Sequence, residues 1–355
     1  VAVAGRQHDL WLGTPMGALK AARRYNAVAG VRQVDGKPGY TLSFTAPGQL
    51  AATLVLDATG LVTRIESTMP HAVLGDTAVV TEFSDYQPAG PLRFPMRIRQ
   101  SQGASEVLDL RVAQVQVDAP VDITVPDNVR GAAERVTSEK VAEGVWFLAG
   151  GSHNSVAIEM ADQMLVVESP LYDGRAIAVL AAANQLVPGK RVKTVINSHH
   201  HFDHAGGLRA AAAEGAVLIT STLAKSYFER VFSNPNRVAP DRLARSGRSP
   251  RIMGVSGSTV LHDPQRPVVI HEMQGSVHAQ GFLMVWLPNE MLLIEADAYT
   301  PGPAGSPPPP APNANHVNLV QNIERLDLKP QRILPLHGRV VPIAELYAQI
   351  GRSAP

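Results

Sequence analysis

Residues 197–207 read NSHHHFDHAGG and hold four histidines and one aspartate within six consecutive positions. The stretch lies in mid-chain, so it is not a terminal expression tag, and a His-rich solvated loop is the other ordinary explanation. The apolar residues 192–196 before it are typical of a buried strand, and the alanine-rich residues 208–214 after it favour a helix. We therefore predict a strand-to-helix turn, in which Gly206 and Gly207 let the backbone pack closely.

The spacing of the histidines indicates which of them act together. In an extended turn, residues two apart point the same way, so His199 and His201 are predicted to converge while His200 points elsewhere. Asp203 and His204 fall where the helix begins. The resulting pattern, H-x-H-x-D-H, offers imidazoles and a carboxylate, which is a ligand set that zinc accepts without thiolate.

Composition excludes several classes of protein. The chain has 355 residues, with 32 Lys and Arg against 31 Asp and Glu, and this balance argues against a general nucleic-acid or membrane-surface protein. No apolar run reaches the length of a membrane span. The absence of cysteine removes disulfides, thiolate zinc sites and cysteine nucleophiles together.

The location of the protein is less constrained by composition. A chain without cysteine is compatible with the periplasm and with the cytoplasm. The first residues, VAVAGRQHDL, have neither a charged n-region nor an apolar h-region, so a secretory signal was either removed or never present. We expect a periplasmic or secreted location in preference to a cytoplasmic one.

The chain changes character near residue 130. Before this point, short alternating runs such as YTLSFTA and TAVVTEFSDY predict antiparallel strands, with one short helix at MGALKAARRY. Residues 1–130 are therefore predicted to form a β-rich N-terminal domain, for which a curved half-barrel sheet is one form. From residue 131 to 355, strands and helices alternate, which is typical of an α/β catalytic domain.

Three further ligand-type residues follow or precede apolar runs in the second domain. His278 precedes FLMVWLP, Asp297 follows MLLIE, and His337 follows RILPL. Each alone is more often structural than metal-binding. In combination with H-x-H-x-D-H, the order His, Asp, His resembles the metallo-β-lactamase fold superfamily of metallohydrolases.

The resemblance covers roughly residues 140 to 350 and implies an α/β (α+β) fold. Two sheets would lie face to face with helices outside, an αββα sandwich, preceded here by the smaller antiparallel β-rich domain. The resemblance also implies two Zn²⁺ ions, although other divalent metals are possible. The implied ligands are His199, His201 and His278 for the first metal, Asp203, His204 and His337 for the second, and Asp297 as a bridge.

Four residues are candidates for a role in catalysis. A hydroxide shared by two zinc ions can attack at neutral pH, and Asp203 would either both ligate a metal and orient that hydroxide or only ligate. In GGSHNS, His153 or Asn154 would donate to a developing oxyanion, with a simple turn as the alternative. Tyr299 would donate to substrate or only pack.

The function implied is that of a dinuclear zinc hydrolase acting on a lactone, ester or lactam. The alternatives are a phosphodiesterase of the same fold, an oxidoreductase like the mononuclear iron persulfide dioxygenases, and a non-catalytic metal-binding protein. We expect a small-molecule substrate, no nucleic acid and no membrane insertion. Homo-oligomerisation is possible, and the N-terminal domain either closes over the cleft or mediates dimer contacts.

Overall fold

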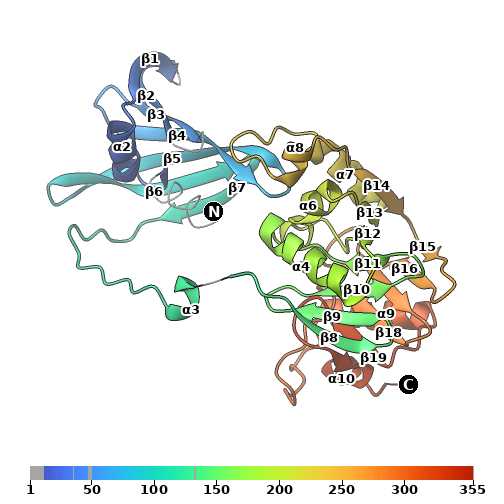
Figure 1. The fold of residues 1–355 in the computed structure, drawn as a ribbon. Coiled ribbons are helices and arrows are strands. Elements are labelled where there is room, and N and C mark those ends of the chain that lie inside the picture. Colours follow the sequence, from blue (N-terminus) through green and yellow to red (C-terminus); the bar gives the residue numbers. More distant parts are fainter. Residues whose placement is uncertain (1–11, 35, 47–49, 132, 355) are drawn as a thin grey trace. The chain divides into compact units, whose positions relative to one another are not determined.

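The computed structural model describes residues 12–34, 36–46, 50–131 and 133–354. Its chain divides into two compact units (Figure 1). The first runs to Arg130 and also includes Pro235–Ala239, and the second contains the rest of the chain from Gly131 onward. The segment Pro235–Ala239 is held by Asp76, whose carboxylate accepts hydrogen bonds from the backbone of Arg237 and Val238 at 2.8 and 3.1 Å.

The first unit is built on a seven-stranded sheet in which every neighbouring pair is antiparallel. Its strands, which pair in sequence order, are β1 (Val28–Val34), β2 (Lys37–Ala46), β3 (Leu50–Leu56), β4 (Val62–His71), β5 (Gly75–Ala89), β6 (Leu92–Gln102) and β7 (Ser105–Arg111). Its helices include α2 (Pro15–Arg24) and the short α3 (Asp127–Arg130). The β-rich N-terminal sheet predicted from alternating residues is therefore confirmed.

Helix α2 covers one face of this sheet (Figure 1). Thr14 caps the helix by accepting a hydrogen bond from the Gly17 backbone at 3.2 Å. The small buried side chains of Ala18 and Ala22 let the helix approach closely, and they share a core cluster with Phe44 and other sheet residues. The helix thereby buries the apolar face of the sheet, and the opposite faces of the strands carry the alternating polar residues. This is the usual arrangement in an antiparallel sheet.

The second unit contains two further sheets. In the first, the strands pair in the order β14 (Arg251–Val255), β13 (Val217–Ser221), β12 (Val192–Ile196), β11 (Met164–Val167), β10 (Ser155–Glu159), β9 (Val145–Ala149) and β8 (Thr137–Ala142). In the second, the order is β15 (Ser258–Leu261), β16 (Val268–Glu272), β17 (Leu283–Leu287), β18 (Leu292–Glu295), β19 (Arg332–Pro335) and β20 (Val341–Pro342). The helices are α4 (Asp173–Leu186), α5 (Phe202–Ala205), α6 (Leu208–Ala213), α7 (Thr222–Phe232), α8 (Arg242–Ser246), α9 (Ala314–Arg325) and α10 (Ile343–Gln349).

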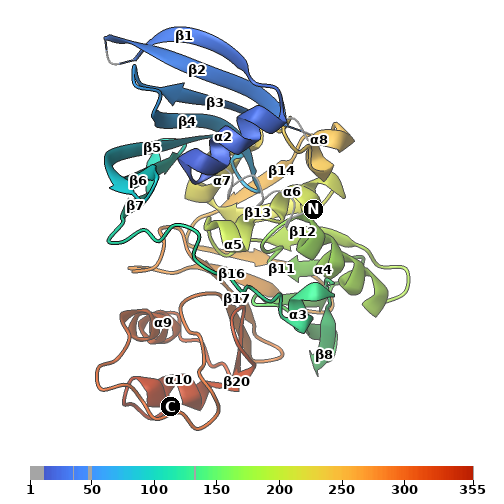
Figure 2. The same cartoon turned by 90° about the vertical axis from the view of Figure 1, so that its left-hand side faces the viewer.

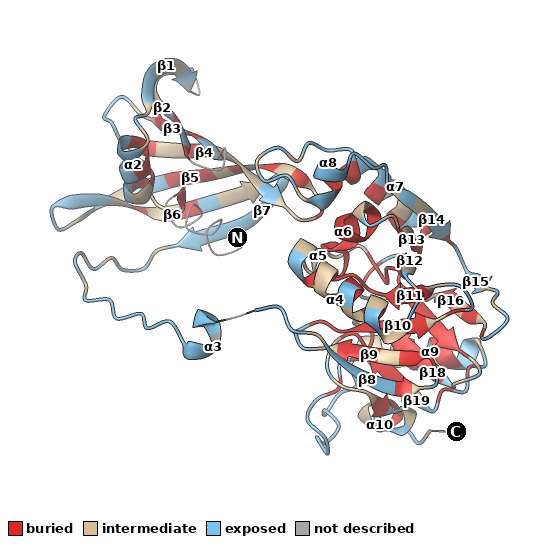
Figure 3. Ribbon diagram, viewed as in Figure 1, coloured by how far each residue is buried: buried red, intermediate tan, exposed pale blue. Residues whose placement is uncertain are grey.

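These two sheets share one hydrophobic core. Val156 and Ile196 of one sheet belong to the same buried cluster as Ile270 and Leu293 of the other, and most residues of the strands concerned are buried (Figure 3). Helices α4, α6 and α7 pack on the first sheet, while α10 contacts both β20 and α9 (Figure 2). The predicted mixed α/β fold, with two sheets packed together and helices outside, is confirmed.

The parallel strand pairs decide where the polar loops gather. Strands β11, β12, β13 and β14 pair in parallel, as do β18 and β19. Glu295 pairs with Pro335, so Asp297 and His337 each follow the end of adjacent parallel strands by two residues. The carboxyl ends of parallel strands lie at one edge of a sheet, and this brings the loops that follow them together.

Among the described residues, no helix combines the length and the apolar character needed to cross a membrane.

The packing at Gly207 gives a first testable prediction. A Cβ at Gly207 would lie 2.4 Å from Cβ of Ala176 and 2.6 Å from the Ser169 carbonyl, although the backbone there is ordinary, with φ at −99°. We expect Gly207→Ala to destabilise the protein by about 1–3 kcal/mol through overpacking, measured by thermal or denaturant unfolding. The control is Gly131→Ala, whose Cβ would meet nothing within 4 Å. Equal stabilities of the two variants would contradict this explanation of the glycine.

Candidate metal centre

Main-chain hydrogen bonds connect the histidine-rich turn to both sheets of the second unit. The Asn197 backbone N–H donates to Ile219 of β13 at 2.8 Å, and Leu283 of β17 donates to the Ser198 carbonyl at 2.8 Å. The turn then enters the single-turn helix α5, for which His201 is the residue before the first turn. Strand β12 and helix α6 lie at 192–196 and 208–213, which confirms the predicted strand-to-helix turn.

A first group of ligand-type nitrogens consists of His199, His201 and His278. Nε2 of His278 lies 3.2 Å from Nε2 of His199 and 3.1 Å from Nδ1 of His201. His199 is fully buried, and its ring stacks on Phe282 with centroids 4.9 Å apart. Two histidines of one turn therefore face a third from a distant loop.

A second group consists of His153, Asp203, His204 and His337, whose ligand-type atoms all lie within 4.8 Å of one another. Nε2 of His204 is 3.1 Å from Nε2 of His337, and 3.7 Å from Oδ2 of Asp203. The same Asp203 oxygen lies 3.1 Å from Nε2 of His153. The first half of the turn thus contributes His199 and His201 to the first group, and the second half contributes Asp203 and His204 to the second group.

Asp297 reaches both groups. Its Oδ2 lies 3.2 Å from Nε2 of His199 and 3.3 Å from Nε2 of His278. The same oxygen is 2.9 Å from Nε2 of His204, and Oδ1 is 3.1 Å from Nε2 of His337. This carboxylate is therefore the group through which the two clusters meet.

These residues fit divalent metal ions. Ligand atoms that share a tetrahedral zinc, with bonds of roughly 2.0–2.1 Å, lie about 3.3 Å apart, which is close to the separations around Asp297. Oδ2 of Asp297 is buried and faces imidazole nitrogens of His199, His204 and His278 at 2.9–3.3 Å. A buried carboxylate oxygen that faces several imidazole nitrogens is an arrangement that a metal ion completes. Imidazole and carboxylate donors suit zinc and other first-row divalent ions.

Glu168 orients His204, and sequence analysis missed it. This buried glutamate accepts a hydrogen bond from Nδ1 of His204 at 3.0 Å, and others from the Ser198 hydroxyl at 2.5 Å and the Asn197 amide at 2.9 Å. Nδ1–H is thereby directed to Glu168, which leaves Nε2 of His204 facing the cluster. The available signal was a charged residue directly after the apolar run of β11.

His337 is oriented in the same way by a main-chain group. Its Nδ1 donates to the carbonyl of Ser152 at 3.2 Å, so Nε2 faces Asp297. His199 has a hydroxyl partner, because its Nδ1 lies 3.0 Å from Oγ of Ser198. Three imidazoles therefore share one orientation, with Nδ1 toward a fixed partner and Nε2 toward the cluster.

The electrostatics of the metal-free cluster favour a proton on His204. Burial lowers the pKa of His204, but contacts with Asp297 and Glu168 outweigh it and raise the pKa to about 10. Burial raises the pKa of Asp297, but its contacts with His204 and His337 hold that pKa well below its usual range. Burial holds the pKa of His199 far below its ordinary value. A cation at the cluster would therefore displace the proton of His204.

The remaining candidate residues lie around the cluster with other partners. The Asn154 side chain donates to the carbonyls of Pro335 and Gly338 at 3.3 and 2.9 Å. The hydroxyl of buried Tyr299 donates to Glu345 of α10 at 3.3 Å. Contacts of Asn154, His153 or Tyr299 with a substrate stay predictions.

His200, whose side chain was predicted to point away from His199 and His201, belongs to neither group of ligand-type atoms. Its ring lies edge-on to Tyr227 at 5.9 Å.

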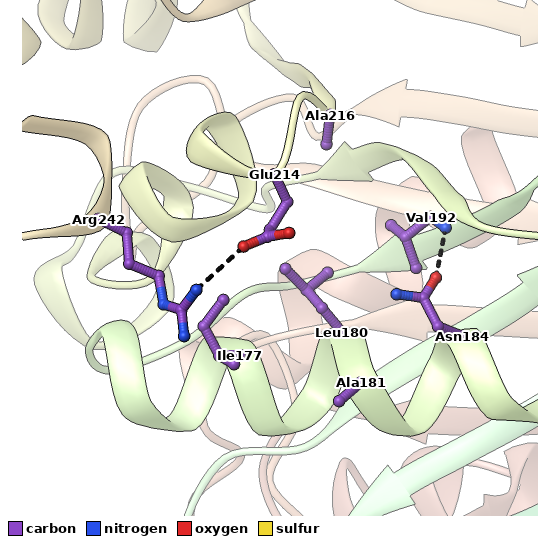
Figure 4. A pocket seen from close by; sticks show the side chains of 8 residues that line it. All are labelled: Ile177, Leu180, Ala181, Asn184, Val192, Glu214, Ala216 and Arg242. Carbon is purple, nitrogen blue, oxygen red and sulfur yellow. Dashed lines mark hydrogen bonds and ion pairs between the residues drawn. The ribbon is translucent and has the colours of Figure 1, made fainter. Parts of the chain in front are cut away.

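A separate pocket lies along α4 (Figure 4). Its polar contacts are an ion pair between Glu214 and Arg242 at 3.2 Å and a hydrogen bond from the Val192 backbone to Asn184 at 2.7 Å. None of the residues that line it belongs to the metal-ligand groups. This pocket is therefore distinct from the histidine cluster.

Comparison with known proteins identifies the family. The model of the metallo-beta-lactamase superfamily matches residues 148–337, which is more than half of the chain and contains all seven implied ligands. The chain therefore belongs to the metallo-beta-lactamase superfamily, and the resemblance inferred from the order of its ligands is confirmed. Members of this superfamily are generally metal-dependent hydrolases.

One curated relative is the 2,4-dinitroanisole O-demethylase subunit alpha of Nocardioides sp. (strain JS1661). The two chains are 26% identical over 170 residues, which is 47% of this chain and 48% of the relative. The match thus spans about half the length of that relative.

Similar solved structures include a metallo-beta-lactamase from Pontibacter korlensis, with 14% identity, a TM-score of 0.47 and coverage of 61% of this chain and 98% of that one. A metallo-beta-lactamase from Pseudomonas aeruginosa in a mono-zinc form has 17% identity, a TM-score of 0.47 and coverage of 62% and 95%.

The buried contact of Glu168 gives a prediction about metal affinity. Glu168→Gln removes the charge that orients His204, and we expect metal affinity to fall by about 10- to 100-fold. The measurement is competition of the apoprotein with a chromophoric chelator. The control is Glu295→Gln, because burial raises the pKa of Glu295 well above its usual range and a neutral amide matches a neutral carboxyl. Equal losses of affinity in both variants would contradict the orienting role.

The raised pKa of His204 predicts how metal binding depends on pH. Below about pH 10 the imidazole of the metal-free protein holds a proton, which a metal at Nε2 must displace. Metal binding near pH 7.5 should therefore release at least one proton, and the apparent affinity should rise as pH increases through the neutral range toward 10. An indicator dye in weakly buffered solution measures the release. Binding without proton release, at an affinity independent of pH, would contradict the charge assigned to His204.

Proposed function

We propose that this chain is a dinuclear metal hydrolase whose substrate is a small carbonyl compound, a lactone, an ester or a lactam. Zinc is the first choice of metal. The observation that carries the proposal is the position of Asp297, whose two oxygens lie within 3.3 Å of imidazole nitrogens from both clusters. A carboxylate in this position is suited to hold two ions side by side.

The proposed roles of the ligands follow their grouping. One ion would be held by His199, His201 and His278, the other by Asp203, His204 and His337, and Asp297 would contact both. When bound, two divalent ions lower the pKa of a shared water and polarise the oxygen of a substrate carbonyl.

Side chains of the protein itself would orient that water and accept its proton. The Asp203 side chain is 31% exposed, more than that of any other carboxylate in the cluster, so its carboxylate is accessible to accept a proton. Glu168 and the Ser152 carbonyl hold His204 and His337 in place, so these imidazoles need not reorganise during the reaction.

Apolar side chains beside the ligands support a substrate with an apolar part. Phe202 stands between His201 and Asp203 in the turn and is 59% exposed, and Val277 directly precedes His278 and is 63% exposed. Ligand sites combine apolar side chains with a few polar groups, and these two side chains lie beside the candidate ligands. We infer that they contact an acyl or aryl group.

A second candidate reaction is removal of the methyl group of an aryl ether. It is favoured by the name of the curated relative, a 2,4-dinitroanisole O-demethylase subunit. In such a reaction water would cleave the ether, with a hydrogen going to the aryl oxygen and the hydroxyl to the methyl group, giving a phenol and methanol. The word subunit in that name also supports a second polypeptide as a partner of this chain, with a homo-oligomer as the other possibility.

Metal content and activity test the proposal together. Purified protein should carry about two equivalents of divalent metal, and chelation should abolish hydrolysis of chromogenic esters, lactones or lactams. Asp297→Ala should lower metal content and reduce activity by at least about 100-fold, because the residue contacts both clusters. The matched control is His200→Ala in the same turn, which should leave both quantities largely intact.

The panel of substrates also contains a nitroaryl methyl ether, a phosphodiester and a persulfide. Activity confined to the ether would favour the second candidate, and activity confined to a phosphodiester would overturn the carbonyl substrate. Iron as the only bound metal, with persulfide oxidation, would overturn the hydrolase. Full activity in chelator without bound metal would overturn metal catalysis altogether.

A further inference from the structure

His153 lies in the second cluster although the H-x-H-x-D-H turn and the three later ligands do not include it. It is 7% exposed and lies between strands β9 and β10. Its Nε2 is 3.1 Å from Oδ2 of Asp203, and its ring centroid is 4.2 Å from that of His337 and 5.2 Å from that of His204. These contacts place it among residues that would hold the second metal.

The loop that carries His153 is joined to the loop that carries His337. The Asn154 backbone donates to the Leu336 carbonyl at 2.8 Å, and the Asn154 side chain donates to the Gly338 carbonyl at 2.9 Å. In the reverse direction, Nδ1 of His337 donates to Ser152 at 3.2 Å. Hydrogen bonds in both directions therefore join the loop of His153 to the loop of His337.

A buried arginine fixes the same loop from its other side. Arg175 is only 1% exposed, and its guanidinium donates to the carbonyls of Arg135, Ala149 and His153 at 2.6, 3.3 and 3.2 Å. Burying a guanidinium costs desolvation free energy, and the hydrogen bonds to these three carbonyls offset part of that cost. The backbone of His153 is thus held by a rigid, charge-assisted contact.

The partner of Nδ1 indicates what Nε2 can do. Nδ1 of His153 lies 2.9 Å from the hydroxyl oxygen of Ser152, which can accept Nδ1–H. Nε2 then has a lone pair facing the cluster, the orientation already found for His204 and His337. A hydroxyl can also donate to Nδ1, in which case Nε2–H would donate to Asp203. These two states make His153 either a metal ligand or a positioning residue.

We propose that His153 is a further ligand of the second metal. The inference rests on the proposed function only in that the site must bind metal. The second position would then have three imidazoles and two carboxylates, from His153, His204, His337, Asp203 and Asp297. The first position would have three imidazoles and Asp297. The two positions therefore differ, because five protein ligands favour a five- or six-coordinate ion, whereas four suit tetrahedral zinc.

Titration of the apoprotein with Co²⁺ tests this assignment, because the visible absorption of Co²⁺ is strong in tetrahedral sites and weak in five- or six-coordinate sites. Wild type should bind two equivalents, one with strong and one with weak absorption. In His153→Ala, the weakly absorbing equivalent should bind about 10- to 100-fold more weakly and absorb more strongly. The other equivalent should be unchanged and serves as an internal measure of folding.

The variant His153→Gln distinguishes a role of His153 as a metal ligand from a role in positioning Asp203. It also provides the test if His153→Ala does not fold. The Gln amide can donate to Asp203 but is a poor substitute for imidazole as a ligand, so we expect it to behave like His153→Ala. Wild-type binding and absorption in His153→Gln would overturn the ligand assignment, as would an unchanged second equivalent in His153→Ala. The control is His200→Ala, with two wild-type equivalents. If wild type binds no Co²⁺, the proposed function fails as well, an outcome distinct from failure in the variants alone.

Discussion

The carboxylate of Asp297 faces four imidazole nitrogens at 2.9–3.3 Å, and loops from both sheets of the second unit meet at this close approach. Lone pairs at such separations repel one another, and a buried carboxylate loses hydration that only a cation or a donor can replace. In the metal-free protein this compensation comes from a proton on His204, whose pKa is about 10. The same negative potential favours a divalent ion over a proton when metal is available.

The fold supplies the rigidity that this arrangement requires. Parallel strands position Asp297 and His337 at the edge of one sheet and the histidine turn at the edge of the other, whereas His278 lies on the connection between the antiparallel strands β16 and β17. Close packing at Gly206 and Gly207 leaves no space for a side chain beneath the turn. Buried Glu168 then fixes the ring of His204. Each of these contacts raises the precision of ligand placement, which decides metal affinity.

Much of the candidate site could be predicted from the sequence, because the ligand-type residues of the turn have a short and characteristic spacing. His199, His201, Asp203 and His204 lie within six residues, and the strands and helix around them have clear apolar patterns. The fold class followed from the same alternation. Glu168 was missed because a single charged residue after an apolar run has many explanations.

Contacts between distant segments could not be predicted from local patterns. The hydrogen bonds of Asn154 to residues 335 and 338, and of Arg175 to residues 135 and 149, join loops that are far apart in sequence. The partner of Tyr299, Glu345, is also distant. For the same reason His153 was recognised as a polar residue in a glycine-rich turn but not as a neighbour of Asp203.

Anomalous diffraction from a crystal of the metal-loaded protein, recorded at the absorption edge of the bound metal, tests the central claim most directly. The account predicts two anomalous peaks roughly 3.5–4 Å apart, one on each side of the Asp297 carboxylate, with the peak nearer His204 also next to His153. A single peak, or two peaks that do not share Asp297, would contradict it.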